Sequence, residues 1–474
     1  RGLGDVYKRQ ILQSAFFKLA DVMPIDDAVE YMKAAAKKSY GKKGDAVVQM
    51  NWKAIDAGLD AVHKVEVPAS WSNPAADPAP KALKGPEALV KQIRDVMEPI
   101  ARMDGDSLPV SAFEGNVNGE WEQGASAYEK RGTAVMVPEW NAEKCIQCNQ
   151  CAFVCSHATI RPFCLTADEA AAAPESTKLA DTKPKASEYK FTMAVSPLDC
   201  MGCGECVTVC PTKAITMVPQ DSQADQQAVF DYCVANISKK ATKMADDTVM
   251  GSQFNQPLLE FSGSCAGCAE TSYARLITQL FGEKMYISNA TGCSSIWGGT
   301  ASISPYTVNK DSGHGPAWCN SLFEDNAEHG LGLYIGQKTI RENLIKEIAE
   351  VAGSDKASAE LKAAYEKFIA TKNNTKANDE PAKALIAELE KAAAAGCEKS
   401  AEILKSKQYI AKKSVWIFGG DGWAYDIGFG GLDHVLASGE DVNVMVFDTE
   451  MYSNTGGQAS KASNIGEVCQ FAAA

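Results

Sequence analysis

The chain has 474 residues, 45% of them hydrophobic, which is enough for well-filled cores in about three domains of ~100 to 200 residues each. Its 60 Asp and Glu outnumber 47 Lys and Arg, and the net charge of -13 disfavours binding to nucleic acid or to membrane phosphates. No stretch approaches the roughly 18 to 20 uninterrupted apolar residues of a membrane span, and the start does not resemble a signal peptide, so we expect a cytoplasmic protein.

The N-terminal part of the chain is predicted to be helical. Residues 11–38 favour two helices separated before Pro24, and residues 51–65 favour a third amphipathic helix. Residues 1–10 show no clear periodicity, and whether they are native to the protein stays open. Because the chain starts without Met and stops in a segment that looks packed, we expect it to be a fragment of a longer polypeptide. We place the end of this first domain at residue 83.

A linker domain is expected over residues 84–122. Five prolines in residues 67–86 exclude a long helix or a central strand just before it. A helical pattern returns in residues 86–100, and residues 104–131 are rich in Gly and polar side chains, which favours loops.

Two cysteine runs of identical spacing come next, each C-x-x-C-x-x-C-x-x-x-C. This is the bacterial-ferredoxin spacing, in which three thiolates on one tight loop bind three irons of a [4Fe-4S] cluster and the fourth Cys ligates the other cluster. Zinc knuckles or a disulfide scaffold are the alternatives, but zinc sites do not require a third and fourth Cys at these offsets. The expected sets are Cys145, Cys148, Cys151 with Cys210, and Cys200, Cys203, Cys206 with Cys155.

We assign residues 123–241 to this ferredoxin-type domain. The polar insertion at residues 167–190 should be solvated loop with one short helix, and residues 219–256 should be a polar connector. Five further cysteines are interpreted as ordinary small side chains, in a protein kept in a reducing compartment: Cys164, Cys233, Cys319, Cys397 and Cys469.

Residues 242–474 are predicted to form an α/β domain. The strings KMYISNATG, SVWIFGGDG and VNVMVFDTE are continuous apolar runs followed at once by Gly, Asp or Thr, as in parallel strands. Between the first and the second, residues 340–413 are dense in Ala, Lys and Glu, which favours two or three surface helices without chemistry, broken near residues 371–379 and at Gly396. The expected fold class is multidomain, α+β followed by α/β.

A third group of cysteines lies in this last domain. Cys265 and Cys268 have C-x-x-C spacing, and Cys293 follows a predicted strand. The spacing alone leaves zinc, a redox dithiol and a third cluster open. A fourth ligand has no compelling candidate, although Cys319 and Cys469 are available.

Two polar segments end predicted strands of the same domain. GDG is common in ordinary turns, but 28 residues after Asp421 a second strand ends in the string DTEMYSN. The Asp421 carboxylate, the Thr449 side chain and the Met451 carbonyl could therefore converge on one Mg²⁺ that binds a diphosphate at the carboxyl ends of adjacent parallel strands.

Taken in order, the tandem cysteine runs and the strings FSGSCAGCAE, NATGCSSIWG, GPAWCNSLFEDNAEHGLG, GGDGWAYDIGFGGLDHV and DTEMYSNTGGQ resemble pyruvate:ferredoxin (or flavodoxin) oxidoreductases. The resemblance runs from about Ile11 onward. It implies a homodimeric thiamine diphosphate enzyme that converts pyruvate and CoA to acetyl-CoA and CO2. Electrons would pass singly through three [4Fe-4S] clusters to ferredoxin or flavodoxin.

The resemblance also implies residue roles. Asp421, Thr449 and the Met451 carbonyl would bind Mg²⁺, and Asn454 would reach toward the substrate. A third cluster would be bound by Cys265, Cys268 and Cys293, with its fourth Cys beyond this chain. Asn51 would lie near CoA. The thiamine diphosphate site would comprise Glu270, Cys293, Gly420, Asp421, Gly422, Trp423, Thr449, Glu450, Met451, Tyr452, Ser453 and Asn454.

The resemblance is incomplete in two respects. Ser156 stands where the family usually has Pro, which should alter a turn without loss of a ligand. Residues 1–83 would be the end of an oxidoreductase gamma-like domain, and the family's N-terminal domains, which carry the Glu that activates thiamine, would be missing. This chain alone is therefore not expected to turn over pyruvate. An oxidoreductase for another 2-oxoacid and an electron-transfer polyferredoxin are the alternatives.

Overall fold

The computed structural model describes residues 2–72, 82–183, 188–240, 245–300, 303–470 and 472–473. The chain divides into two compact units, residues 1–82 and residues 83–474. Each is described by itself. Within the described ranges, no helix has both the length and the apolar character needed to cross a lipid bilayer.

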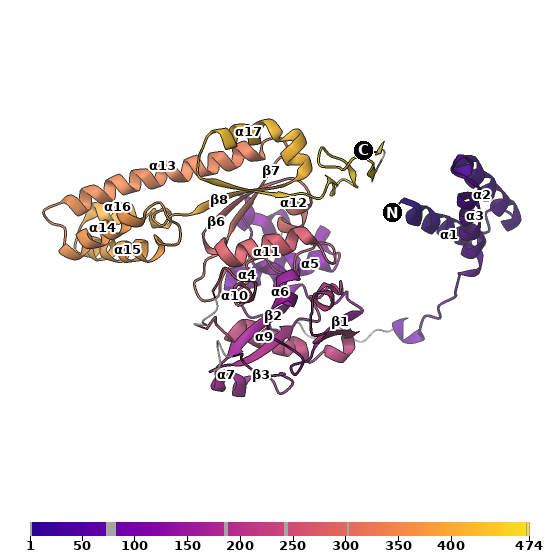
Figure 1. Cartoon of the computed structure of the whole chain (residues 1–474), viewed down its shortest axis with the longest axis horizontal. Coiled ribbons are helices and arrows are strands. Elements are labelled where there is room, and N and C mark those ends of the chain that lie inside the picture. Colours follow the sequence, from indigo (N-terminus) through magenta and orange to yellow (C-terminus); the bar gives the residue numbers. More distant parts are fainter. Residues whose placement is uncertain are drawn as a thin grey trace. The chain divides into compact units, whose positions relative to one another are not determined.

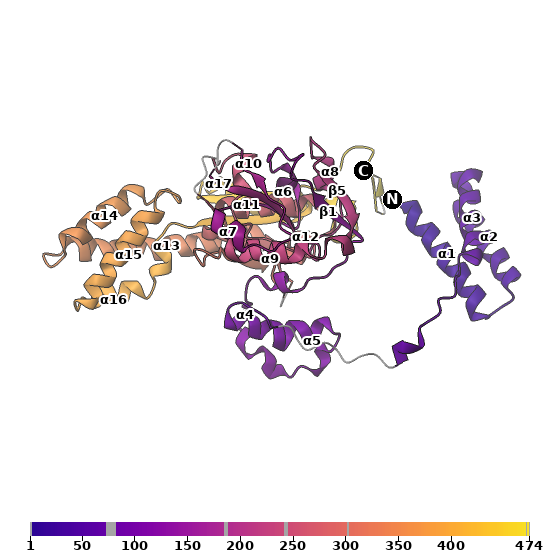
Figure 2. The same cartoon turned by 90° about the horizontal axis from the view of Figure 1, so that it is seen from below.

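The first unit is a group of three helices (Figure 2), α1 (Gly2–Ala20), α2 (Ile25–Tyr40) and α3 (Asp45–Asp60). Met32, Ala36 and Ile55 form its buried core. Pro24 stands immediately before α2, where its fixed φ suits a helix start and its missing N–H costs no helical bond. The predicted break is thus confirmed, whereas α3 begins earlier than expected. The 3₁₀ helices η1 (Gly41–Lys43) and η2 (Ala69–Ser72) complete the described elements.

The second unit begins with a short helical stretch, α4 (Glu87–Gln92), the π-helical turn η3 (Ile93–Met97) and α5 (Glu98–Ala101). Three 3₁₀ helices follow, η4 (Gly105–Ser107), η5 (Val110–Asn116) and η6 (Ala125–Tyr128), in a segment predicted to be loop. Leu89, Ile93, Met97 and Ala125 pack into one small core that joins α4 and η3 to η6.

The cysteine runs lie in a small two-sheet structure. Strand β1 (Met136–Trp140) pairs antiparallel with β5 (Ile215–Pro219), and a three-stranded antiparallel sheet has the order β2-β4-β3. These strands are β2 (Ile160–Leu165), β4 (Lys190–Val195) and β3 (Ala180–Asp181), and short helices α6 (Gln150–Val154) and α8 (Glu205–Thr208) carry cysteines. The predicted short helix of the insertion is α7 (Ala167–Ala172), which begins with a capping box between Thr166 and Glu169.

The prediction that residues 219–256 are only a connector is wrong. They contain η8 (Gln220–Gln223), α9 (Gln226–Asn236) and α10 (Val249–Ser252). The buried side chains of α9 are Val229, Phe230 and Cys233, and they share a core with Leu165 of β2. The polar residues that flank α9 concealed its apolar face.

A four-stranded parallel sheet forms the centre of the α/β region, in the order β7-β6-β8-β9 (Figure 1). Its strands are β6 (Met285–Ala290), β7 (Ala317–Ser321), β8 (Ser414–Gly420) and β9 (Val442–Phe447). Three of them were predicted, and β7 was missed. One face packs against α11 (Ala269–Phe281) and α12 (Cys293–Gly298), and the other packs against α13 (Asn326–Gly353) and α17 (Phe429–Ala437). The predicted parallel-sheet class is confirmed.

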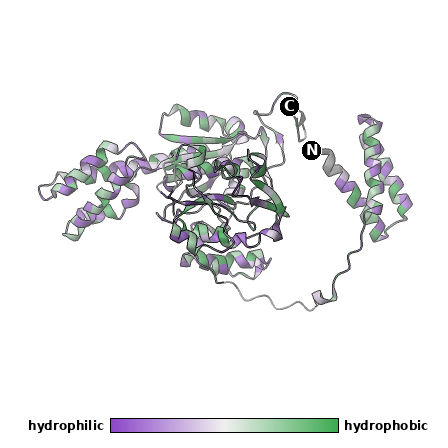
Figure 3. Ribbon diagram, turned by 60° about the horizontal axis from the view of Figure 1, so that its bottom comes forward, coloured by the Kyte–Doolittle hydropathy of each residue, from purple (hydrophilic) through white to green (hydrophobic). Residues whose placement is uncertain are grey.

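The helices between β7 and β8 form a cluster with its own core. At its C-terminal end, α13 meets α14 (Ala359–Thr371), α15 (Asp379–Ala394) and α16 (Glu398–Leu404), around Ile348, Phe368 and Leu385. Apolar and polar residues alternate along these helices (Figure 3). Both predicted breaks are confirmed, but α13 starts at Asn326 rather than near residue 340. The remaining elements are η9 (Gly282–Lys284), η10 (Lys407–Tyr409), the π-helical η11 (Gly422–Ile427), and the two-stranded pairs β10 (Met451–Tyr452) with β11 (Gln458–Ala459) and β12 (Val468–Cys469) with β13 (Ala472–Ala473).

Candidate functional site

The two cysteine runs fold alike, residue by residue. Gln147 and Asn149 in the first run adopt positive φ of 61° and 60°, and Gly202 and Gly204 occupy the same places in the second run, with 68° and 79°. These left-handed turns curl the loop so that its amides face the sulfur atoms. The N–H groups of Gln147 and Gly202 donate to the first sulfur of each run at 3.3 and 3.4 Å.

The last cysteine of each run is held in the same way. The N–H of Thr159 donates to Cys155 Sγ at 3.4 Å, and that of Ala214 donates to Cys210 Sγ at 3.2 Å. Such N–H···S contacts stabilise a thiolate. Each loop therefore offers polarised amides to a cluster of anionic ligands.

Electrostatic neighbours group the eight cysteines across the two runs. Burial raises the pKa of Cys151, and the adjacent thiols of Cys145, Cys148 and Cys210 are among the groups that influence it. Burial, together with smaller contributions from Cys155 and Cys203, raises the pKa of Cys200 to about 12. Cys210 is thus among the electrostatic neighbours of the first run, and Cys155 is among those of the second.

Cys206 links the two groups. Burial raises its pKa, and both Cys155 and Cys151 raise it further. The described residues hold no group of three or more His, Cys, Asp or Glu arranged for a single metal ion. The assignment of individual ligands stays a prediction.

The third group of cysteines is also brought together. Burial raises the pKa of Cys293, a hydrogen bond from Ser453 lowers it, and Glu270, Cys268 and Cys265 raise it. Cys268 directly precedes α11, and Cys293 is the first residue of α12, so two helix N-termini meet at these thiols.

The loop of this third group lies against the second cysteine run. A Cβ on Gly267 would be 3.5 Å from Cys203 Cβ, which is ordinary van der Waals contact. The two spare cysteines are engaged elsewhere, because Cys319 donates to the Ile287 carbonyl at 3.4 Å and Cys469 contacts Ser463 Oγ at 3.7 Å.

The predicted magnesium ligands converge at the carboxyl ends of β8 and β9. The N–H and the hydroxyl of Thr449 both donate to Asp421 Oδ1 at 3.1 Å, and the hydroxyl also lies 3.0 Å from the Met451 carbonyl. Asp421 is only 1% exposed, and no ion pair reaches it from the described residues. A buried carboxylate beside two further oxygens is the kind of donor set that Mg²⁺ binds.

Sequence reasoning missed one member of this group. Ser460 Oγ donates to Asp421 Oδ2 in a short hydrogen bond, and Ser463 Oγ donates to the Glu450 carbonyl at 2.5 Å. The segment 460–463 therefore closes over the DTEMYSN turn. No motif marks it, although the spacing of two serines after the glycine pair was visible.

Glu270 lies beside the same group. It is 8% exposed, and its Oε2 accepts a hydrogen bond from Trp297 Nε1 at 2.8 Å. Burial raises the pKa of Glu270, the Trp297 hydrogen bond lowers it, and the charge of Asp421 raises it. Residues from three separate motifs thus face one another.

The two segments predicted to bind a diphosphate also fit each other sterically. A Cβ on Gly422 would lie 2.6 Å from the Tyr452 ring, and one on Gly419 would lie 2.4 Å from the Trp423 ring. Gly420 ends β8, and Glu450 has a positive φ of 61° at the turn. Asn454 is exposed in the turn that follows Tyr452, and its proposed role at the substrate stays a prediction.

Asn51 lies in the first unit and is fully buried. Its side-chain oxygen accepts from Gln10 Nε2 at 2.6 Å, and its nitrogen donates to the Val47 carbonyl at 2.7 Å. Its amide therefore holds helices together, and its place near CoA stays a prediction.

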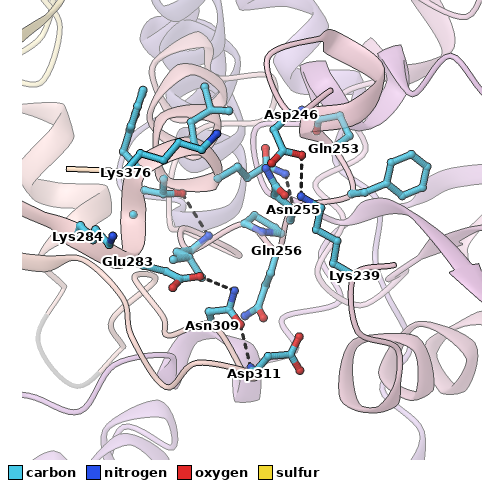
Figure 4. Close-up of a pocket in the computed structure, with 18 of the residues that line it drawn as sticks. Lys239, Asp246, Gln253, Asn255, Gln256, Glu283, Lys284, Asn309, Asp311 and Lys376 are labelled. Atoms are coloured by element: carbon cyan, nitrogen blue, oxygen red, sulfur yellow. Dashed lines mark hydrogen bonds and ion pairs between the residues drawn. The ribbon is translucent and has the colours of Figure 1, made fainter. Parts of the chain in front are cut away.

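A pocket elsewhere in the second unit contains none of the predicted site residues. It has a volume of about 1430 Å³ and lies among residues such as Lys239, Asp246, Glu283 and Asn309 (Figure 4). Its wall charges bind one another, with Lys239 Nζ 2.6 Å from Asp246 and Asn309 donating to Glu283 at 2.8 Å.

Comparison with known proteins defines the class first. Residues 144–214 match the model of a 4Fe-4S dicluster domain, and residues 79–134 match a domain of unknown function. The chain is therefore an iron–sulfur protein in which a ferredoxin-type dicluster domain precedes an α/β region with a parallel sheet.

Relatives then define the family. The chain is 49% identical to a pyruvate-flavodoxin oxidoreductase of Klebsiella pneumoniae, 48% to a pyruvate:ferredoxin oxidoreductase of Moorella thermoacetica, and 42% to a mitochondrial pyruvate dehydrogenase [NADP(+)] of Euglena gracilis. These alignments cover 100%, 98% and 98% of this chain and 40%, 40% and 25% of the relatives. The chain is a homologue of the pyruvate-flavodoxin and pyruvate:ferredoxin oxidoreductases, which confirms the resemblance, and it spans about 40% of their length.

Proposed function

We propose that this chain supplies the electron-transfer and cofactor-binding part of a pyruvate:ferredoxin or pyruvate:flavodoxin oxidoreductase. The substrates would be pyruvate and CoA, and the products acetyl-CoA and CO2. The observation that carries the proposal is the contact between Ser453, in the diphosphate-binding segment, and Cys293, in the third cysteine group, where the hydroxyl donates to the sulfur at 3.2 Å. A site for carbon chemistry and the start of an electron path are thus adjacent.

The donor set supports a magnesium diphosphate at this place. Asp421 lacks a cation partner among the described residues although it is buried, and Thr449 and Met451 present further oxygens to the same point. Thiamine diphosphate, when bound, supplies the stabilised carbanion that decarboxylation of a 2-oxoacid requires. The chain would orient it through Asp421, and Ser460 would hold the second oxygen of that carboxylate in place.

The cysteine groups support a path of three [4Fe-4S] clusters. Cys293 would be the ligand nearest the cofactor, and the Gly267 contact with Cys203 would bring the third cluster close to the cluster of Cys200, Cys203, Cys206 and Cys155. The influence of Cys151 on Cys206 then leads to the remaining cluster, from which ferredoxin or flavodoxin would accept electrons one at a time.

Cofactor binding can be tested on the chain itself by calorimetric titration with thiamine diphosphate in the presence and absence of Mg²⁺. We expect Mg²⁺-dependent binding that Asp421→Asn weakens at least tenfold. Asp433→Asn, at an exposed position of α17, should bind like the wild type. Binding that does not depend on Mg²⁺, or that Asp421→Asn leaves unchanged, would contradict the proposed site and favour an electron-transfer protein.

The reaction can be tested by exchange of segments. This chain would replace its aligned segment in the Klebsiella pneumoniae relative, and the chimera would be assayed for CoA-dependent flavodoxin reduction with a panel of 2-oxoacids. We expect activity with pyruvate. A chimera with full iron content that prefers another 2-oxoacid, or that reduces flavodoxin with none, would refute the assignment.

A further inference from the structure

Arg275 is a buried cation without a carboxylate partner in the described structure. It lies in the middle of α11 and is 1% exposed. Its guanidinium donates to the side-chain oxygens of Gln253 at 3.0 Å and Gln279 at 2.5 Å, and to the backbone carbonyl of Phe153. All three acceptors are neutral, and within the described residues Nε has no hydrogen-bond partner. A charge taken out of water without a counter-charge is strongly disfavoured, so a nearby anion is expected.

The surroundings identify that anion. Burial lowers the pKa of Arg275 to about 10, the neighbouring thiolate of Cys155 raises it, and the charge of Arg161 lowers it. Arg161 is already paired with Glu260, so it and its partner add little net charge. Arg275 stays protonated at neutral pH, and the carbonyl that it contacts belongs to Phe153 in the last turn of α6. The carbonyls of a last helical turn point toward the helix end, which here is Cys155, a predicted ligand of the second cysteine group.

We propose that Arg275 is the counter-ion of the cluster bound by Cys155, Cys200, Cys203 and Cys206, and that its charge raises the reduction potential of that cluster. The inference rests on the proposed function, because it requires the clusters. On reduction the cluster takes one electron from the neighbouring third cluster, and the net charge of the cluster with its four thiolates becomes more negative by one unit, with no proton moved. A fixed buried cation stabilises the reduced form more than the oxidised form.

A purely structural role has to be separated from this one. Phe153 lies in α6 between Cys151 and Cys155, so loss of the guanidinium also removes a contact to the backbone between ligands of both clusters. Gln253→Glu provides the matched variant. It keeps Arg275 and its hydrogen bond but places a carboxylate where the amide oxygen is now 3.0 Å away, which neutralises the charge.

Glu205 provides a control of opposite sign on the same cluster. It is exposed at the start of α8, and it is among the groups that raise the pKa of Cys203 after burial. Glu205→Gln removes one negative charge beside this cluster and should raise its potential slightly. Because Glu205 is exposed, its effect should shrink at high salt, whereas the effect of buried Arg275 should not.

The experiment is a redox titration of the two ferredoxin-type clusters, followed by electron paramagnetic resonance. It uses the full 474-residue chain after anaerobic reconstitution, as wild type, Arg275→Gln, Arg275→Lys, Gln253→Glu and Glu205→Gln. We expect one midpoint potential to move to more negative values in Arg275→Gln and Gln253→Glu, to stay nearer the wild-type value in Arg275→Lys, and to move to more positive values in Glu205→Gln.

Different results overturn different claims. If the wild-type chain binds no iron–sulfur clusters, the proposed function fails. If clusters assemble but Gln253→Glu leaves both potentials unchanged, the counter-ion role is refuted, even where Arg275→Gln loses its clusters. If the Arg275 variants shift one midpoint potential and Glu205→Gln shifts the other, Arg275 belongs to the other cluster and the proposal is refuted as stated.

Discussion

The buried ion pair between Arg161 and Glu260 joins the dicluster domain to the α/β region. The substitution Glu260→Gln tests whether this pair holds the two parts together. Both side chains are 7% exposed, Arg161 belongs to β2, and Glu260 lies just before the third cysteine group. Removal of one partner from a buried pair costs about 3 to 5 kcal/mol, because the remaining charge is left uncompensated. The Gln amide can still accept a hydrogen bond, so we expect about 3 kcal/mol.

The position of the Arg161 side chain should survive the substitution. Arg161 also donates to the Ala158 carbonyl at 2.6 Å and lies 5.1 and 5.2 Å from the ring centres of Phe230 and Phe261. These contacts should keep the guanidinium in place, so we expect local opening rather than global unfolding.

Hydrogen exchange measured by mass spectrometry would report this opening in β2 and in residues 257–262. A loss of about 3 kcal/mol corresponds to roughly 100-fold faster exchange there. The matched control is Glu402→Gln, which breaks the Lys405–Glu402 pair, whose side chains are 70% and 69% exposed; it should change stability by about 1 kcal/mol or less. If exchange in β2 accelerates no more than exchange in α16 does in the control, the buried pair does not hold the two parts together.

Three further predictions address the helical cluster, a reactive thiol and the diphosphate turn. Phe368 is 0% exposed, and Phe368→Ala should destabilise the helical cluster by about 3 to 5 kcal/mol in thermal unfolding without loss of iron from the chain. If iron is lost together with this stability, the helical cluster supports the dicluster domain. A hydrogen bond from Ser400 lowers the pKa of Cys397, so the pH profile of Cys397 alkylation should have a midpoint below pH 9.0, and this midpoint should rise toward 9.0 in Ser400→Ala. Burial raises the pKa of Cys233 to about 12, so Cys397 should be alkylated faster than Cys233. Peptide mapping that finds the two thiols equally reactive would refute this. Gly422→Ala should weaken thiamine diphosphate binding through its clash with Tyr452, while Gly430→Ala, in open space, should not; equal affinities would mean that the turn adapts.

Much of the fold could be predicted because local chemistry and tertiary structure agree. The apolar runs of β6 and β8 are largely buried strands, that of β9 is a half-buried strand, and Pro24 separates two helices. The missed elements are those where the local sequence pattern and the tertiary structure disagree. Strand β7 has the sequence AWCNS, and four of its five residues are exposed or half-buried, because among the described strands it is an edge strand that pairs with β6 alone.

The early start of α13 shows tertiary packing that overrides helix propensity. Its first turns contain Gly330, Gly332 and Gly336, which disfavour a helix in isolation. A Cβ on Gly330 would lie 2.5 Å from Ile417 in β8, so glycine permits close approach of the helix to the sheet. No pattern within the helix itself reports a requirement set by a strand that lies far along the chain.

The candidate site likewise contains residues that could be predicted from the sequence and residues that could not. Asp421, Thr449 and Met451 were predicted because the segments that contain them follow two apolar strands, and the sheet brings them within hydrogen-bond distance. Ser460 could not be predicted, because its partner is fixed by the fold of the DTEMYSN turn rather than by spacing. Arg275 has the sequence context of any surface residue of an amphipathic helix.

Helix α11 explains why these parts depend on one another. It begins directly after Cys268 and presents Glu270 to Trp297 in the candidate cofactor site. Five residues later, Arg275 of the same helix donates to the Phe153 carbonyl, two residues before Cys155. A rigid helix fixes the distance between these groups, so the candidate cofactor site and the cysteine loops cannot shift independently. Under the proposed function, the position of the clusters relative to the cofactor site would be set by the α/β region as much as by the ferredoxin-type loops, and a change in α11 should alter both ends at once.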